Sequence, residues 1–187
     1  MLLVAVALPS WSADISLLDS PANQQIVITG DIDIGDYEKF LNIVLEGGIE
    51  HSTVYLASRG GNALEAMKIG RVIRNLRFEV EVPQYFEEIG GYCKYKPIAE
   101  QNCVCGSACV LIYLAGFHRY GNYLGIHRTF LSHSTLKEMN MEEAAQVSRN
   151  ISETLDTYLG DMGAPASLLE KMESIPSHDI EFLGVGI

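Results

Sequence analysis

The residues best suited to covalent chemistry are a serine and a histidine that lie 20 positions apart. Ser107 lies in the small-residue stretch 104–109, at the head of the apolar run 110–116, and His127 ends the stretch 123–127. Hydrolases assemble a nucleophile and its base from a serine at the start of a buried helix and a histidine on a separate element. The spacing therefore predicts Ser107 as nucleophile and His127 as general base.

Two glycines upstream supply a second part of such a site. The apolar stretch 53–57 runs into Ser58-Arg59-Gly60-Gly61, and an amphipathic segment follows. Glycine leaves the backbone N–H unobstructed and allows unusual φ and ψ angles, so Gly60 or Gly61 can face a developing oxyanion. The amide of Ala108, at the start of the helix after Ser107, is the predicted second donor. These features together indicate acyl transfer.

Each of these residues also has a structural interpretation. A serine before an apolar run is commonly a helix N-cap, and a histidine between apolar neighbours is commonly a structural residue. The combination favours chemistry over either residue alone. The other histidines flank predicted elements or lie in the tail and are expected at the surface, namely His51, His118, His133 and His178.

Composition limits the classes of partner. The chain has 187 residues, 48% of them hydrophobic, which is enough for one domain with a sizeable core and too short for two. Its net charge of -11 repels phosphate backbones and anionic lipid surfaces, so we expect no nucleic-acid partner. A cluster at helical spacing is interpreted as a solvated helix face rather than an anion site, namely Lys68, Arg71, Arg74 and Arg77.

The first 13 residues resemble the back half of a secretory signal. Residues 2–8 are apolar, and small residues follow at Ser10, Ser12 and Ala13, where a signal peptidase could cut. The usual basic region is missing, and an N-terminal core strand is the alternative. Seven apolar residues are far short of the ~20 that span a bilayer, and no other segment predicts a span. We expect a truncated signal peptide over 1–13 and a single domain over 14–187, in the periplasm or secreted.

The four cysteines fall within one 17-residue window, at Cys93, Cys103, Cys105 and Cys109. In an exported protein this clustering predicts disulfides, with Cys93 paired to Cys103 or Cys105 as the preferred bridge. Zinc is the alternative, but the paired C-x2-C spacing of zinc knuckles is missing, so no metal site is expected.

Hydrophobic periodicity predicts alternating strands and helices. Strands are expected over 26–30, 53–57, 78–82 and 123–127, and helices over 37–45, 63–76, the run after Ser107, 136–159 and 166–172. Acidic residues in 31–36 are expected to cap the first helix, Asn62 with Glu65 the second, and a Thr135/Glu138 capping box the long one. Residues 84–101 are an irregular excursion, and 172–187 have no clear assignment. The alternation indicates an α/β fold of repeated strand-helix units.

The order of these motifs resembles the Clp protease proteolytic subunit of the Clp/crotonase superfamily, and more closely a set of small exported Clp-like proteins of bacteria. The matching stretches are Ser58-Arg59-Gly60-Gly61, Gly106-Ser107-Ala108-Cys109 with the apolar run to Gly116, and Gly125-Ile126-His127-Arg128. The resemblance spans about residues 26–160. It implies a spiral of strand-helix turns and assembly into homo-oligomeric rings.

The resemblance also implies roles for single residues. Ser107 is the implied nucleophile, His127 the base, and Gly60 or Gly61 with Ala108 the oxyanion hole. The family's third member, an aspartate, would fall near Pro176, where there is no acid; Asp179 is ranked first among its neighbours, ahead of Glu173 and Glu170.

The leading hypothesis is an exported serine peptidase that acts on a peptide or protein substrate and needs no cofactor. The alternatives are a catalytically idle Clp-like peptide-binding or assembly module, and a crotonase-type acyl-thioester enzyme that would not use the serine and histidine in these roles.

Overall fold

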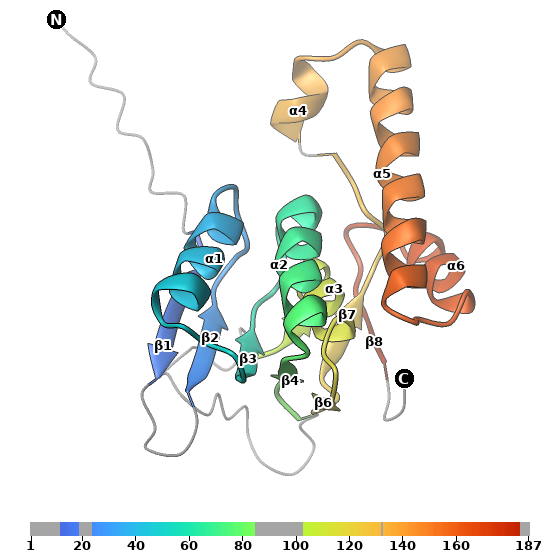
Figure 1. Cartoon of the computed structure of the whole chain (residues 1–187). Coiled ribbons are helices and arrows are strands. Elements are labelled where there is room, and N and C mark those ends of the chain that lie inside the picture. The colour runs from blue at the N-terminus through green and yellow to red at the C-terminus, as the bar shows by residue number, and fades with distance from the viewer. Residues whose placement is uncertain (1–11, 19–23, 85–102, 132, 184–187) are drawn as a thin grey trace, which may run out of the picture.

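The computed structural model describes residues 12–18, 24–84, 103–131 and 133–183. Strands and helices alternate along much of this part of the chain (Figure 1). The strands are β1 (Asp14–Leu18), β2 (Gln25–Thr29), β3 (Thr53–Ala57), β4 (Glu79–Glu81), β5 (Cys105–Gly106), β6 (Arg119–Tyr120), β7 (Leu124–Ile126) and β8 (Glu181–Leu183). The helices are α1 (Asp36–Glu46), α2 (Ala63–Leu76), α3 (Ala108–Leu114), α4 (His133–Lys137), α5 (Met141–Asp161) and α6 (Ser167–Ser174).

The strands form two small sheets. One has the order β1-β2-β3-β4-β6, parallel except for the antiparallel edge strand β1, and the other has the order β5-β7-β8, with β8 antiparallel to β7. A parallel bridge between Ser58 and Cys105 joins the end of β3 to β5. The two sheets therefore meet at the ends of the strands that carry the glycine turn and Ser107.

The predicted α/β class is confirmed, and the buried residues explain it. Three consecutive residues of β2 are fully buried, namely Ile26, Val27 and Ile28. This is expected for an internal strand that is covered on both faces. In β4 the alternation predicted from Phe78 to Val82 holds, with Val80 buried and the two glutamates half-exposed. One main apolar core runs through the described residues, which form a single domain.

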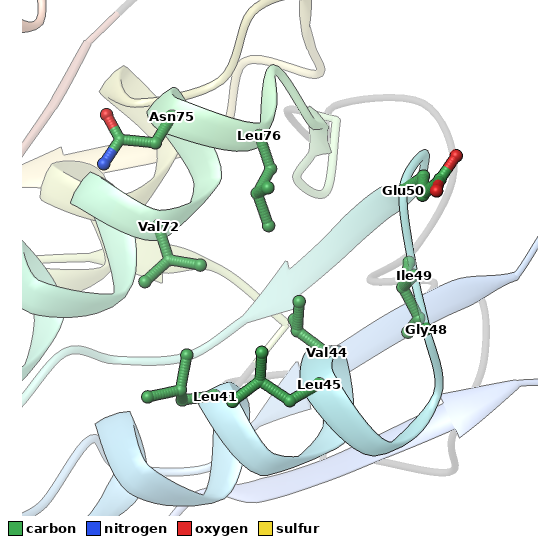
Figure 2. Close-up of a pocket in the computed structure, with 9 residues that line it drawn as sticks. All are labelled: Leu41, Val44, Leu45, Gly48, Ile49, Glu50, Val72, Asn75 and Leu76. Carbon is green, nitrogen blue, oxygen red and sulfur yellow. The ribbon is translucent and has the colours of Figure 1, made fainter.

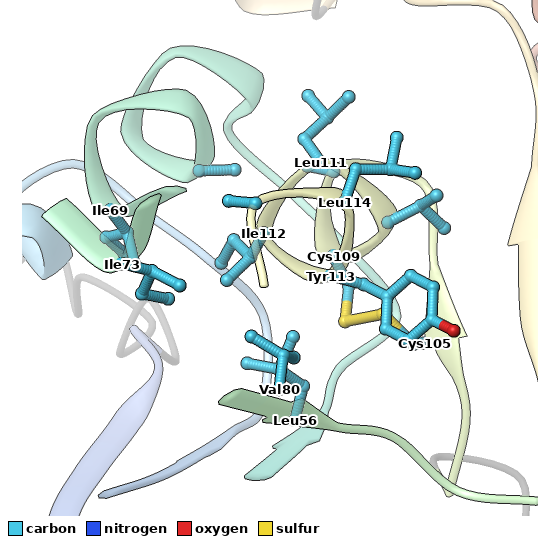
Figure 3. Close-up of a cluster of buried hydrophobic side chains, with 14 of the residues drawn as sticks. Leu56, Ile69, Ile73, Val80, Cys105, Cys109, Leu111, Ile112, Tyr113 and Leu114 are labelled. Atoms are coloured by element: carbon cyan, nitrogen blue, oxygen red, sulfur yellow. A yellow bond between two sulfur atoms is a disulfide. The ribbon is translucent and has the colours of Figure 1, made fainter. Parts of the chain in front are cut away.

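Helix α3 lies at the centre of that core. All seven of its residues are buried, from Ala108 to Leu114. It packs against α2, whose Ile69 and Ile73 face it together with Leu56 and Val80 of the sheet (Figure 3). The short helix that follows Ser107 is therefore anchored on all sides by apolar contacts.

The long helix predicted over 136–159 is wrong in its first turns. The chain forms the short helix α4, which ends at Lys137, and a separate helix, α5, begins at Met141. Asn140 caps α5 by accepting hydrogen bonds from the amides of Glu142 and Glu143. The capping box is formed by Asn140 and Glu143, not by Thr135 and Glu138, because the Asn140 amide donates in turn to the Glu143 carboxylate. In Figure 1, α4 and the first half of α5 extend away from the sheets.

The basic cluster on α2 is engaged in structural contacts, which agrees with its interpretation as a helix face. Arg71 pairs with Asp161 at 2.8 Å, and Arg74 donates to the carbonyl oxygens of Leu114 and Met162. Lys68 pairs with Glu65 at 2.7 Å, and Arg77 lies over the Phe117 ring. Among the described helices, none combines the length and apolarity that a bilayer crossing requires.

Two buried carboxylates hold the start of α1. The predicted cap among residues 31–36 is wrong in detail, since the cap position is Gly35, which has no side chain to accept a bond. Instead, the Glu65 carboxylate of α2 accepts hydrogen bonds from the backbone amides of Gly35 and Tyr37, each with an N···O distance of 3.0 Å. Asp36 accepts the amide of Ala13 and the hydroxyl of Ser12. The two carboxylates therefore tie α1 to α2 and to the start of β1.

Acid is expected to destabilise the fold through these two groups. Burial alone would raise the pKa of the Asp36 and Glu65 carboxyls, but hydrogen bonds from Ser12, Lys68 and backbone amides hold each pKa below its ordinary value of 3.8 or 4.5. A carboxyl whose pKa is depressed by folding contributes stability above its unfolded pKa and loses it as the pH falls through its folded pKa. We expect the melting temperature to fall steeply below about pH 4.5, and the fall to be smaller in Asp36→Asn. Thermal melts from pH 7 to pH 3 measure this, and an unchanged pH dependence in the variant would contradict it.

Candidate active site

The glycine turn after β3 lies against the segment that carries Ser107. The amide of the buried Ser58 donates to the Val104 carbonyl at 2.8 Å, and the Gly106 amide donates to the Ser58 carbonyl at 2.9 Å. The Ser58 hydroxyl accepts the Gly60 amide at 3.1 Å, which closes the turn. Two segments that are almost 50 residues apart in sequence are thereby hydrogen-bonded at the candidate site.

Only glycine fits at the two positions that follow. Gly60 and Gly61 have φ angles of +113° and +129°, which disfavour any residue with a Cβ. A Cβ on Gly60 would lie 2.6 Å from Ser107 Cβ and 3.0 Å from the Ala108 nitrogen, and a Cβ on Gly61 would clash with the Ile32 carbonyl oxygen. The turn is therefore in direct contact with Ser107 and Ala108.

Ser107 has a strained backbone and an uncommitted side chain. Its φ and ψ angles are 52° and -123°, outside the regions that a non-glycine residue ordinarily occupies. Its amide donates to the Gly125 carbonyl at 2.7 Å, and it stands at the N-cap position of α3 without a side-chain capping bond. The N-cap interpretation of this serine is wrong, because its half-buried hydroxyl caps no amide of the helix.

Two backbone N–H groups are free beside this serine. Within the described part of the chain, the amides of Gly61 and Ala108 donate to no acceptor, whereas the Gly60 amide is held by Ser58. Free amides next to a serine are the donors that an oxyanion requires. Of the two glycines singled out from the sequence, Gly61 is the one whose N–H is available.

A disulfide brackets the strained serine. Cys105 of β5 and Cys109 of α3 are bonded to each other across a sequence separation of 4, and both are fully buried (Figure 3). Of the two bridges expected for Cys93, the one to Cys105 is therefore wrong, and neither sulfur of this disulfide is available to bind zinc. Cys103 is also disulfide-bonded, while Cys93 lies outside the described residues.

Removing that disulfide is expected to loosen Ser107. For Cys105→Ala/Cys109→Ala we expect a loss of about 2 kcal/mol in the free energy of unfolding, the lower end of the usual range because the closed loop is short. We also expect slower reaction of Ser107 with a fluorophosphonate, since less covalent structure holds its backbone. Urea unfolding and labelling rates measure the two effects. A variant that matches the wild type in both would contradict this role of the disulfide.

His127 directly follows strand β7, which pairs with the strand that precedes Ser107. Gly106, the residue before Ser107, pairs with Gly125 of β7. His127 comes two residues after Gly125. The ring is half-buried, and its Nδ1 lies 2.7 Å from the Arg128 carbonyl oxygen. In the described part of the chain no hydrogen bond joins it to Ser107, and catalytic bonds of this kind are often loose before substrate binds.

Asp179, the predicted third catalytic residue, forms no ion pair with His127 among the described residues. Its side chain is 63% exposed, and its carboxylate lies 3.6 Å from Nε2 of His178. Of the other two acids considered, Glu173 accepts the Ser152 hydroxyl and Glu170 is exposed. The remaining histidines with described side chains, His51 and His118, are exposed.

Sequence analysis missed an apolar residue next to the site. The Cγ1 atom of Ile180 would lie 2.8 Å from a Cβ on Gly125, and its Cδ1 atom 3.4 Å from one on Gly106. Ile180 therefore covers the glycine pair that supports Ser107 and His127. Glycine at both paired positions, Gly106 and Gly125, indicates that another side chain covers them. The segment that carries Ile180 lies in the tail that had no assignment from the sequence.

A separate apolar cavity of about 400 Å³ lies between the C-terminal ends of α1 and α2 (Figure 2). Val44 and Leu45 line it from one helix, and Val72 and Leu76 from the other. The glycine turn precedes the opposite end of α2, about 20 Å away along the helix axis. The cavity is therefore not part of the candidate active site.

Comparisons with known proteins agree on the fold and go no further. No family model matches the chain, and no curated protein does. A solved structure of a ClpP1 point mutant from Listeria monocytogenes is similar, with a TM-score of 0.50 and 17% identity over 86% of this chain and 82% of that one. The fold is therefore similar to that of ClpP.

Proposed function

We propose that this chain is an exported serine peptidase. The observation that carries the proposal is Ser107, whose strained backbone presents an uncapped hydroxyl next to two free amides, with His127 directly after the adjoining strand. No metal or other cofactor is required by this chemistry, because the reacting groups all belong to the chain.

The proposed reaction uses the four groups in order. His127 Nε2 takes the hydroxyl proton of Ser107 as Oγ attacks the substrate carbonyl. The resulting oxyanion accepts hydrogen bonds from the amides of Gly61 and Ala108. The histidinium then gives its proton to the leaving amine, and water repeats the sequence to release the acyl group. Gly60 contributes by letting the turn approach Ser107 within van der Waals contact.

A peptide digest distinguishes catalysis from binding. A mixture of unstructured peptides incubated with the protein and read by mass spectrometry should show new termini that are absent with Ser107→Ala. A second candidate function, an idle Clp-like binding module, is favoured by the absence of a carboxylate on His127 among the described residues. It predicts that peptides are retained by the wild type and by Ser107→Ala alike, and are not cut by either.

Export is part of the proposal and rests on the cysteines and the N-terminal segment. The Cys105–Cys109 disulfide is compatible with an oxidising compartment such as the periplasm or the extracellular space. Cleavage after residue 13, the boundary expected from the sequence, would remove Ser12 and Ala13, which hydrogen-bond Asp36, whereas cleavage after Ser10 retains both. We expect the intact mass of protein purified from the periplasm to correspond to a chain that begins at Trp11. Recovery with residues 1–10 attached would contradict this.

Assembly is proposed on the similarity of fold. We expect the strand-helix units to continue as the spiral of the Clp/crotonase superfamily and the chain to form a homo-oligomer. Light scattering of the purified protein measures the mass of the particle, and a monomer at micromolar concentration would contradict the oligomer.

A further inference from the structure

The hydrogen bond of His127 identifies its tautomer. Nδ1 lies 2.7 Å from the Arg128 carbonyl oxygen, and a carbonyl oxygen only accepts. Nδ1 therefore carries the proton, and Nε2 keeps the lone pair that a general base uses. This is the tautomer that the third member of a catalytic triad selects.

The residue that carries this carbonyl is held by a backbone hydrogen bond through its amide. The Arg128 amide donates to the Ile175 carbonyl at 3.0 Å, and Ile175 is buried with its own amide bonded to Met172. On the other side of His127, Ile126 pairs with Glu181 of β8. The backbone is therefore fixed on both sides of the histidine.

The nearby carboxylates have other partners. Asp179 faces His178, Glu181 pairs with Lys171 at 2.6 Å, and Glu173 accepts a hydroxyl hydrogen bond. Within the described part of the chain, no carboxylate hydrogen-bonds or ion-pairs with His127.

We propose that the Arg128 backbone carbonyl, rather than a carboxylate, orients His127. The inference rests on the proposed function and makes the site a serine-histidine pair with a neutral orienting group. Arg128 is then a positioning residue that acts through its backbone, and its exposed side chain is dispensable. The carbonyl fixes the tautomer and direction of the ring, which is one of the two roles of a third member.

Three variants separate the alternatives, each read by the rate of fluorophosphonate labelling and by the ¹⁵N and ¹H signals of the His127 ring. Asp179→Asn removes the candidate carboxylate, and Arg128→Ala removes only the side chain. In the third, the α-hydroxy analogue of Thr129 replaces that residue, which turns the amide that contains the Arg128 carbonyl into an ester and weakens it as an acceptor.

We expect Asp179→Asn and Arg128→Ala to label within about 2-fold of the wild type, and the ester to label about 10-fold more slowly with a shifted Nδ1–H signal. A fall of 100-fold or more in folded Asp179→Asn, or an ester with unchanged rate and ring signals, would overturn the inference. If the wild type does not label, the proposed function fails. The ring signals then decide the orientation of His127 independently, since the ester should still shift them and Asp179→Asn should not.

Discussion

Ser107→Ala and His127→Ala are each expected to lower peptide hydrolysis by about 10⁴-fold or more, and the double variant by no more than the worse of the two. Groups that act as a unit lose nearly everything with the first removal, because neither the hydroxyl nor the imidazole works alone. Gly106 pairs with Gly125, so the strand that precedes Ser107 lies beside the strand that precedes His127. Turnover of a peptide found in the digest measures the effect.

Folded controls are available for both substitutions. The Ser107 hydroxyl makes no capping bond, so its removal should leave helix α3 intact. Ser174→Ala and His178→Ala change an exposed serine and an exposed histidine elsewhere on the chain and should retain full activity. A double variant much slower than either single one would show that Ser107 and His127 act independently, which contradicts the proposed pair.

Gly60→Ala is expected to lower kcat by about 10²–10³-fold while KM changes little. The new methyl group would lie 2.6 Å from Ser107 Cβ and 3.0 Å from the Ala108 nitrogen, and would push the turn away from the oxyanion donors. Donors aimed at an oxyanion act mainly in the transition state, so their displacement appears in kcat. Steady-state kinetics on a cut peptide separate the two constants.

Gly163→Ala is the matched control for this substitution. Gly163 also has a positive φ, of +70°, but a Cβ there would meet nothing within 4 Å, and it lies after α5. Both substitutions place a methyl group at a positive φ, and only that of Gly60→Ala encroaches on the site. Equal losses of kcat in the two folded variants would contradict the oxyanion role of the turn.

The sequence was sufficient for the parts of the site that depend on local signals. An apolar strand that ends in paired glycines, and a small-residue turn before an apolar helix, are patterns that a few neighbouring residues determine. For this reason the strands near 26–30 and 53–57 and the helix near 63–76 were predicted within one residue at each end. The contact between Gly60 and Ser107 follows from parallel pairing of their segments. Parallel pairing is the arrangement that alternating strands and helices predict.

The remaining features depend on long-range pairing. Strand β8 has only three residues and pairs with β7, more than 50 positions earlier, so no local period reveals it or places Ile180 on the glycine pair. Strands β5 and β6 have two residues each, too few for an alternation to be recognised. The pairing of Cys105 with Cys109 required knowledge that the chain turns sharply at Ser107, which φ and ψ show and composition does not.

The most direct test of the central claim, that Ser107 is an activated nucleophile, is to locate a fluorophosphonate adduct by mass spectrometry. The purified protein is treated with the probe, digested, and compared with Ser107→Ala and His127→Ala. We expect an adduct on Ser107 of the wild type and none at that position in either variant. A folded wild-type protein that stays unlabelled, or that carries the adduct on another residue, would contradict it.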